Sequence, residues 1–467
     1  MKIFKMKFIF FLLILESFYF SCFATTINDI AQLNPIIVDK VIIPKSIEEI
    51  SQLVTNHSGP ICMGGGRYSQ GGQIATENCL FLDMRNMDKI INLDIKKRKI
   101  TVETGITWIK ILKTIDPKGL SPKIIQSFYN FTVGGSLSVN IHGRYIGEGA
   151  IIRSVESIKI ILADGSIKEA SRTVNPKLFF AAIGGYGGIG IIVEATLNLS
   201  ENIHLERISK RMDITKYKDY FFNNIKSSKE SVLHNADIYP PNYTQINAIT
   251  WNKTEKPLTI KEKLSLPTKI SPLKKSLLTL FSNRNFRKFY RQYLYDPYKY
   301  YGHVVAWRNY EISDDVSMLE PLAQKNSIFV LQEYFIPVEN FNSFVPKMAN
   351  ILNKHRVNVF NISIRHALTD SESLLAWAQK EVFSFVIYYE QEKFSVDKKD
   401  AYKWTSELID TALEEQGTYY LTYQIIATPT QFIKSYPGSK EYFTFKKLID
   451  PNYKFRNKFF DQYYPSF

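Results

Sequence analysis

Two kinds of periodicity alternate along the first two hundred residues. Short runs of β-branched and other apolar residues predict strands at 36–38, 41–43, 99–103, 158–162 and 190–199. Apolar side chains that recur every three or four residues predict helices at 47–54, 107–115 and 175–183. This mixture of strands and helices indicates an α+β fold for the first part of the chain.

The pattern changes near residue 203, where glycine-rich turns give way to aromatic, basic and proline-containing segments. Strands are predicted beyond this point at 328–336, 357–365 and 383–389, and helices at 340–352 and 403–415. A sheet covered by helices fits this order, so we place a domain boundary at about residue 203. The sequence contains no internal repeat of fixed period and no low-complexity segment.

Composition agrees with a globular protein of two domains. The chain has 467 residues, of which 45% are hydrophobic and 22% charged, so it lacks the signature of a disordered protein. Only Cys62 and Cys79 lie outside the first 24 residues, and two cysteines are too few for a disulfide scaffold. We therefore expect stability to come from the hydrophobic cores.

The start of the chain has the features of a secretory signal. Lys2, Lys5 and Lys7 are followed by an apolar stretch at 8–15 and by Ala24 at the small-residue position, which predicts a signal peptide over residues 1–24. Glu16 interrupts the apolar stretch, so a permanently spanning helix is less favoured and an uncleaved anchor stays open. We expect an exported protein that is periplasmic, membrane-associated or extracellular.

The formal net charge is +14, and much of the excess lies between residues 261 and 299. Leucines and aromatic residues among these cations predict an amphipathic helix that begins at Ser271 and Pro272. A solvated helix face is one interpretation; peripheral contact with an anionic membrane or an anionic polyprenyl-phosphate substrate is the other. Nucleic-acid binding is not expected, because no binding module accompanies the charge.

Two glycine-rich turns lie about seventy residues apart, at 62–72 and 131–136. Glycine tolerates positive φ and lets successive main-chain amides approach a phosphate oxygen, so two such turns can enclose one diphosphate. Arg67 can add charge-assisted hydrogen bonds to the same anion. A third set of glycines, at 184–190, matches the spacing of a dinucleotide fingerprint. However, a helix is predicted before it and a strand after it, which disfavours a Rossmann NAD site.

These turns, with the segments 80–84, 100–105, 157–165 and 178–192, resemble the PCMH-type FAD-binding domain of the vanillyl-alcohol oxidase family. The likeness covers roughly residues 36–200 in the family's order. The resemblance implies a two-subdomain FAD-binding domain over residues 25–203 and an α+β substrate, or cap, domain over 204–440 with a mainly antiparallel sheet. Residues 448–457 resemble the family's closing segment, so residues 441–467 are expected to return to the FAD domain.

Within this family the chain looks most similar to the decaprenylphosphoryl-ribose oxidases and to the aldonolactone and alditol oxidases. Many relatives tether FAD through a histidine directly before Ser69, where this chain has Tyr68, so the resemblance implies non-covalent FAD. His142 is an FAD contact or a structural histidine. The resemblance assigns to FAD the residues Gly64, Gly65, Gly66, Arg67, Tyr68, Ser69, Ser127, Thr132, Val133, Gly134, Gly135, His142, Gly143, Ile191 and Tyr420.

The cap domain is expected to supply the catalytic residues Arg365, Glu333 and Tyr423. Arg365 matches an arginine that faces the substrate in relatives, whereas Ser363 replaces their nearby acid. Glu333 is expected to act as a base or to pair with a neighbouring cation. Tyr423 occupies the position of a lysine in relatives, and it is expected to be a hydrogen-bond donor, a base if its pKa is lowered, or an ordinary half-buried tyrosine. No metal-binding motif is present.

Together these features predict an FAD-dependent oxidoreductase that oxidises a CH–OH group of a sugar, polyol, aldonolactone or glycosyl lipid. The electron acceptor is left open between oxygen, a quinone and a protein. A membrane-associated component that acts on a polyprenyl-phosphoryl pentose competes with a soluble lactone or polyol oxidase. A flavin-containing binding or surface protein with decayed catalysis is the alternative, because Ser363 and Tyr423 depart from the family pattern.

Overall fold

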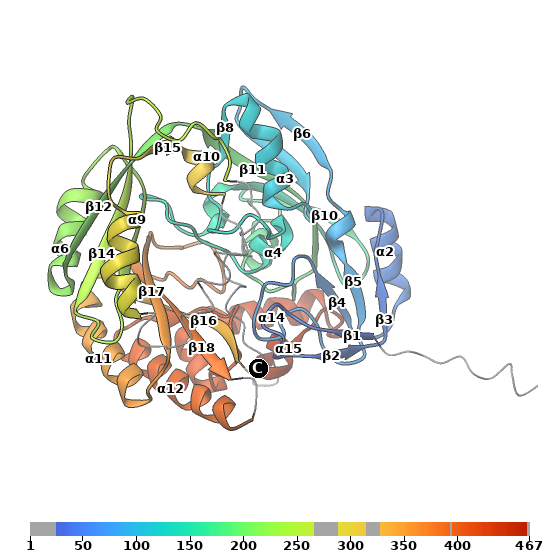
Figure 1. Ribbon diagram of the computed structural model, residues 1–467. Helices are drawn as coiled ribbons and strands as arrows, with labels where there is room; N and C mark the ends of the chain where they lie inside the picture. Colours follow the sequence, from blue (N-terminus) through green and yellow to red (C-terminus); the bar gives the residue numbers. More distant parts are fainter. Residues whose placement is uncertain (1–24, 266–287, 314–326, 393–394, 465–467) are drawn as a thin grey trace, which may run out of the picture.

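The computed structural model describes residues 25–265, 288–313, 327–392 and 395–464 (Figure 1). The predicted signal peptide and most of the predicted basic helix, including Ser271 and Pro272, lie outside the described residues. Among the helices that are described, none is both long and apolar enough to cross a membrane.

The first layer is a small parallel sheet in the order β3-β5-β4, formed by β3 (Lys40–Ile42), β5 (Leu80–Asp83) and β4 (Ile61–Gly64). Helix α2 (Ile47–Asn56) connects β3 to β4. Ser46 caps this helix by accepting a hydrogen bond from the amide of Glu49, and Ile50 and Val54 face the core. A two-stranded ribbon, β1 (Thr25–Ile27) with β2 (Ile36–Val38), precedes this layer.

The second layer is an antiparallel sheet in the order β10-β9-β11-β7-β6. Its strands are β10 (Ile167–Ser171), β9 (Val155–Ile161), β11 (Ile191–Glu201), β7 (Lys99–Glu103) and β6 (Ile90–Asp94), and β8 (Leu120–Pro122) pairs with the far end of β11. Helices α3 (Trp108–Ile115), α4 (Val133–Ser138) and α5 (Pro176–Ala182) contribute to the same core. Alternating burial along β11 reflects the two-residue period of a strand with one face in the core.

The third layer is an eight-stranded antiparallel sheet in the order β15-β12-β14-β13-β17-β18-β16-β19. The strands are β12 (His204–Asp213), β13 (Ser231–Ile238), β14 (Gln245–Lys253), β15 (Val305–Trp307), β16 (Ser327–Pro337), β17 (Val359–Ala367), β18 (Val382–Glu392) and β19 (Thr418–Tyr419). Helices α11 (Phe341–Lys354) and α12 (Ser395–Glu414) lie together beside β16, β17 and β18 (Figure 1). The opposite face of these strands is left for the cavity described below.

The end of the chain lies beneath the first layer (Figure 1). Helices α13 (Pro429–Ser435), α14 (Ser439–Ile449) and α15 (Lys458–Tyr463) follow the cap sheet. Phe455 forms a bridge with Ile61 of β4, and the Asn457 side chain donates to the carbonyl of Tyr186. A Cβ on Gly188 would lie 2.1 Å from the ring of Phe460. The turn at Gly188 and α15 therefore pack more closely than any residue with a side chain would allow.

The predicted fold class is confirmed, and each strand and helix predicted from periodicity within the described residues is present within a few residues of its expected bounds, except that α12 starts eight residues earlier. Strands β12, β13 and β14 were not predicted. The two remaining cysteines form one disulfide, Cys62–Cys79, with their Cα atoms 6.0 Å apart. This disulfide joins β4 to the residue before β5. From the sequence, the two cysteines were expected only to be too few for a disulfide scaffold.

Candidate active site

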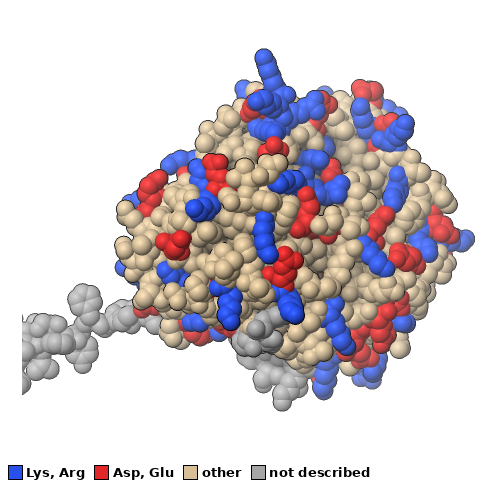
Figure 2. Space-filling model, turned by 180° about the vertical axis from the view of Figure 1, so that it is seen from behind, with Lys and Arg blue, Asp and Glu red and all other residues tan. Residues whose placement is uncertain are grey.

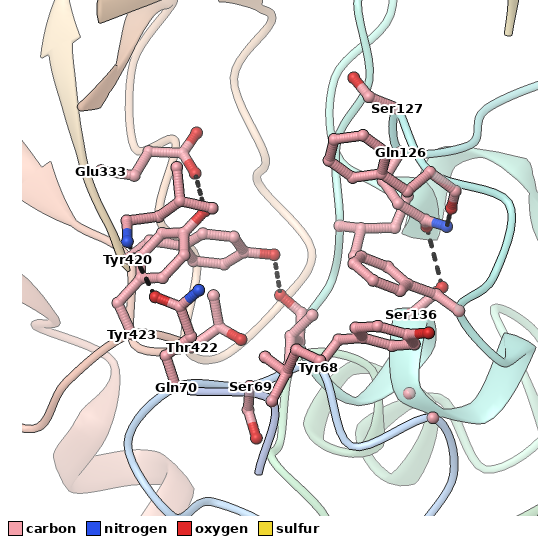
Figure 3. A pocket seen from close by; sticks show the side chains of 18 of the residues that line it. Tyr68, Ser69, Gln70, Gln126, Ser127, Ser136, Glu333, Tyr420, Thr422 and Tyr423 are labelled. Carbon is pink, nitrogen blue, oxygen red and sulfur yellow. Dashed lines mark hydrogen bonds between the residues drawn. The ribbon is translucent and has the colours of Figure 1, made fainter. Parts of the chain in front are cut away.

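A cavity of about 670 Å³ lies between the two glycine-rich turns and the open face of the cap sheet. Figure 3 shows Tyr68, Ser69, Gln126 and Ser127 on one side of it, and Glu333, Tyr420 and Tyr423 on the other. This volume lies within the ordinary range for cofactor and substrate pockets. Residues far apart in the sequence therefore meet around one enclosed space.

The two glycine-rich turns touch each other at the cavity wall. A Cβ on Gly65 would lie 2.1 Å from the hydroxyl oxygen of Thr132, so only glycine fits at this contact. Thr132 caps α4 by accepting a hydrogen bond from the amide of Gly135. Gly64, Gly65, Gly66, Gly134 and Gly135 all line the cavity, so the turns present backbone to it side by side.

Arg67 is held in place below these turns. Its backbone has a φ of 61°, and its guanidinium donates to Asp83 at 2.9 Å. Asp83 also accepts two hydrogen bonds from the Arg85 guanidinium and one from the Arg85 amide. Burial raises the pKa of Asp83, but the hydrogen bonds from Arg85 and the charges of both arginines outweigh burial and lower it. Asp83 is therefore a carboxylate that fixes Arg67 at the edge of the cavity.

Two buried polar atoms at this wall have no hydrogen-bond partner within the described residues: Nε of Arg67 and the hydroxyl of Ser69. Unpaired buried donors are costly, so they indicate a polar ligand. The glycine contact and these donors fit a group that carries a diphosphate. The Tyr68 ring packs against Phe131 with centroids 4.4 Å apart.

Glu333, on β16, lies at the centre of the opposite wall. Its side chain is 2% exposed, and it accepts hydrogen bonds from Nε2 of His142 at 2.5 Å, from the Ser384 hydroxyl and from the Tyr423 hydroxyl at 3.1 Å. Burial raises the pKa of Glu333, yet His142, Arg365 and Ser384 together lower it below its usual value. Glu333 is therefore ionised and shared by three donors.

Tyr423 and Arg365 flank this carboxylate. Burial and the charge of Glu333 raise the pKa of Tyr423 well above its usual value, so the phenol is protonated and donates. The condition under which Tyr423 could act as an unaided base, a lowered pKa, is thus not met. Burial lowers the pKa of Arg365 while Glu333 opposes that shift, and the buried Nε of Arg365 has no partner in the described structure. An unpaired guanidinium donor faces the cavity beside Glu333.

Tyr420 joins the two walls. Its hydroxyl donates to the carbonyl of Val139 at 2.8 Å, and its amide donates to the carbonyl of Glu333. Gln70 makes a similar connection, because its side-chain oxygen accepts from the amide of Leu331 at 2.9 Å. These bonds hold the segments of the two glycine-rich turns against β16, and they set the width of the cavity.

Most residues proposed from the sequence are brought together. Of the eighteen proposed residues, sixteen line the cavity, and Val133 and Gly143 do not. Val133 is fully buried in the core. A Cβ on Gly143 would lie 2.4 Å from the carbonyl of Ile125, so this glycine serves backbone packing. Val133 and Gly143 therefore support the shape of the cavity wall from behind it.

The sequence analysis missed Gln70, Asp237 and Asn361, which line the cavity, and Ser384, which donates a hydrogen bond to Glu333. Ser384 had a usable signal, because it is the one polar residue among the apolar and aromatic side chains at 382–387. In a buried strand such a residue indicates a hydrogen-bonding role.

Comparison with known proteins identifies the domain that carries the glycine-rich turns. Residues 38–171 match the model of an FAD binding domain. This matched stretch contains both glycine-rich turns. This finding confirms the resemblance and FAD as the cofactor of the domain, and the cavity wall described above is the wall that this FAD domain contributes.

Relatives of the FAD domain include proteins with different donors in their names. The chain is 29% identical to cytokinin dehydrogenase 3 of Arabidopsis thaliana over 45% of this chain and 41% of that protein. It is 24% identical to L-gulonolactone oxidase of Bos taurus, over 46% and 48%. It is 31% identical to the mitochondrial L-galactono-1,4-lactone dehydrogenase 2 of Oryza sativa subsp. japonica, over 31% and 24%. The chain thus spans less than half the length of these relatives.

Proposed function

We propose that the protein is an FAD-dependent oxidoreductase that oxidises a CH–OH group of a sugar, polyol, aldonolactone or glycosyl lipid. The observation that carries this proposal is the cluster of Glu333, Tyr423 and Arg365, which faces the glycine-rich turns of the FAD domain across one cavity. The glycine-rich turns and Arg67 would hold FAD, which would supply the hydride acceptor for the oxidation.

The residues of the chain account for the remaining charge and proton. Arg365 can donate to the substrate oxygen and stabilise its negative charge as the proton leaves. The substrate hydroxyl proton moves to the oxygen of Tyr423 while the phenol proton moves along the existing hydrogen bond to Glu333. His142 and Ser384 hold the carboxylate in position for that transfer. The products are a carbonyl compound and a protonated Glu333.

The names of the relatives support an oxidoreductase and leave the donor open. Gulonolactone oxidase and galactonolactone dehydrogenase are named for lactones, whereas cytokinin dehydrogenase is named for a cytokinin. The unpaired Nε of Arg365 beside a polar cluster favours a hydroxylated donor, because such a donor supplies oxygen acceptors. The electron acceptor is a separate question that reoxidation with oxygen, quinones or a protein acceptor addresses.

The cofactor is proposed to be non-covalent, because Tyr68 replaces the tethering histidine and packs on Phe131. Acid precipitation of the purified protein should leave a yellow supernatant over a colourless pellet. A yellow pellet would contradict this part of the proposal without affecting the identity of the cofactor.

Anaerobic reduction tests the activity itself. Candidate polyols, aldoses and aldonolactones are added to the purified holoprotein, and the flavin absorbance should bleach with at least one class. Persistent yellow flavin with every class would support the alternative of a binding protein with decayed catalysis. Bleaching by a cytokinin, with none by hydroxylated donors, would also reject the CH–OH proposal.

Export and peripheral membrane contact are proposed as well. The aromatic segment, residues 288–301, carries the exposed side chains Tyr298 and Tyr301, which are 84% and 85% exposed. Its one acidic residue, Asp296, is buried, while Lys288 and Lys299 are cations. The face in Figure 2 has interspersed cations and anions, so the net charge does not form a single patch there. Aromatic and cationic side chains together favour an anionic lipid surface.

A further inference from the structure

The cap sheet carries a polar row that runs away from the flavin side of the cavity. Strand pairing places Glu333 of β16 opposite Val386 of β18, Val386 opposite Ser363 of β17, and Ser363 opposite Asp237 of β13. All four residues line the cavity, as alternation along antiparallel strands requires for side chains on one face. The row thus begins at the proposed catalytic carboxylate and ends at a second carboxylate.

The length of this row exceeds one sugar ring. Neighbouring strands are about 4.8 Å apart, so the three spacings place Asp237 about 14 Å from Glu333. The hydroxyls of a single ring cannot bridge both carboxylates at that separation. The cavity therefore has a distal compartment that a monosaccharide oxidised beside Glu333 would leave unfilled.

Carboxylates and the cations that balance them form the polar side of this compartment, where Asp237, Asp296, Arg291 and Lys299 all line the cavity. Asp237, 7% exposed, accepts from Arg291 at 3.1 Å and from the Asn361 amide at 3.3 Å, which leaves acceptor sites on its carboxylate. The side-chain oxygen of Asn361 is buried and has no partner among the described residues. Asp296 also neutralises Arg291, at 3.5 Å. Free acceptors and balanced charge favour uncharged donors such as hydroxyl groups over phosphate.

Aromatic rings form the apolar side of the same compartment. Phe329, Phe360 and Tyr388 line the cavity and pack on one another, with centroids 5.2–6.2 Å apart. An aromatic surface beside hydroxyl acceptors suits a sugar ring, which has an apolar C–H face and a polar edge. The two sides of the compartment are thus complementary to one ligand class.

We propose that this compartment is a second sugar subsite, formed by Asp237, Asn361, Phe329, Phe360 and Tyr388. The donor is then a disaccharide, a longer saccharide or a glycoside, whose terminal unit is oxidised beside Glu333 while the next unit occupies the distal subsite. This inference rests on the proposed function, because it extends the same substrate site.

The test compares matched sugars on the holoprotein by isothermal titration calorimetry. Glucose is compared with cellobiose and maltose, and xylose with xylobiose. At least one disaccharide should bind about tenfold or more tightly than its monosaccharide, since the distal acceptors gain hydroxyl partners. Asp237→Asn and, separately, Asn361→Ala should remove most of that advantage and leave monosaccharide affinity within about twofold. Asp213→Asn, at a partly exposed aspartate outside the cavity, is the matched control.

Equal affinity for monosaccharides and disaccharides in the wild-type protein would overturn the subsite, whatever the variants do. Equal losses for both sugars in Asp237→Asn would overturn it too. Flavin bleaching by a monosaccharide or lactone without any gain for disaccharides would reject the subsite and leave the proposed function standing. Tight disaccharide binding without bleaching by any donor would support the subsite and reject the proposed oxidation.

Discussion

Glu333 shows how a single buried carboxylate organises the candidate active site. A fully buried charge is unfavourable unless donors surround it, and here His142, Ser384 and Tyr423 supply three. Burial raises the pKa of Glu333, but His142, Arg365 and Ser384 together keep it below its usual value, so Glu333 is ionised and can accept a proton that a neighbouring donor delivers. The hydrogen bond from Tyr423 provides that route, which is why the two residues act as a pair.

Glu333→Gln should slow anaerobic flavin reduction by about a hundredfold or more, because the amide cannot accept the phenol proton. Stopped-flow absorbance with any donor that bleaches the wild-type protein measures this rate. The FAD content should stay unchanged, since Glu333 lies on the cap side of the cavity. The exposed Glu339→Gln is the control, and a Glu333→Gln rate equal to that control would remove Glu333 from the proton path.

Arg365→Ala should lower the same rate by about a hundredfold, because the charge that develops on the substrate oxygen loses its donor. Arg365→Lys should recover part of the rate, since it keeps the charge and loses the planar fork. The surface variant Arg98→Ala, whose guanidinium pairs with Glu201, serves as control. An unchanged rate in Arg365→Ala would show that this side chain does not contact the reacting oxygen.

At the scale of elements, hydrophobic periodicity predicted the apolar strands, including β16, β17 and β18 beside the cavity, and failed at β13. β11 and β18 are apolar over most of their length, so they were expected near their actual bounds. β13 was missed because Asn235 and Asp237 replace apolar residues on its cavity face and His234 faces the core. In β13, the polar residues that line the cavity thus interrupt the apolar alternation by which a strand is recognised in a sequence.

His234 should make stability depend on pH. It is buried in β13 between the Tyr217 hydroxyl and Thr250, and burial, with a contribution from His366, lowers its pKa to about 3. The unfolded chain therefore binds a proton that the folded protein does not as pH falls below about 6.5. Stability should fall with decreasing pH in that range, with up to about 1.4 kcal/mol per pH unit from this group.

His234→Gln should flatten that slope in urea unfolding measured from about pH 7 to about pH 4.5, whatever its effect on absolute stability. His303→Gln, at an exposed histidine, is the matched control and should retain the wild-type slope. The same slope in His234→Gln and the wild-type protein would show that His234 does not carry the pH dependence.

The aromatic segment makes a prediction at the same scale. The triple variant Leu294→Ser, Tyr298→Ser and Tyr301→Ser should bind phosphatidylglycerol vesicles several-fold more weakly in cosedimentation, because it removes exposed apolar area. Added salt should weaken binding of the wild-type protein. Tyr402→Ser on α12, at an exposed tyrosine outside the aromatic segment, should have no effect. Equal sedimentation of the triple variant and this control would exclude the segment as the lipid contact.

At the scale of the whole molecule, local signals identified the FAD side of the site, and long-range pairing decided the cap side. Each glycine-rich turn is one continuous stretch of sequence, so its anion-binding chemistry can be inferred before the fold is known. Asp237, Ser363 and Glu333 line one row of the cavity only because of the register of β13, β17, β18 and β16. No spacing along the chain encodes that register, so the distal compartment could not be predicted from the sequence.

Lys446 fixes the returning end of the chain and provides a stability test. It is fully buried and donates to Asp450 and to the carbonyls of Gly188 and Phe455 at 2.8–2.9 Å. Lys446→Met removes the cation that pairs with the buried Asp450 carboxylate, and it should lower the free energy of unfolding by about 3–5 kcal/mol. Thermal unfolding should shift to lower temperature, with flavin released earlier. The adjacent exposed Lys447→Met is the control, and an equal melting temperature for both would contradict this role.

Residues 455–457 complete one wall of the cavity. Arg456 and Asn457 line it, and Phe455 pairs with Ile61 of the strand that leads into the first glycine-rich turn. Because this pairing joins segments almost four hundred residues apart, local opening of residues 455–457 would also open the cavity to solvent. Retention of a bound cofactor is therefore coupled to the local stability of this short segment.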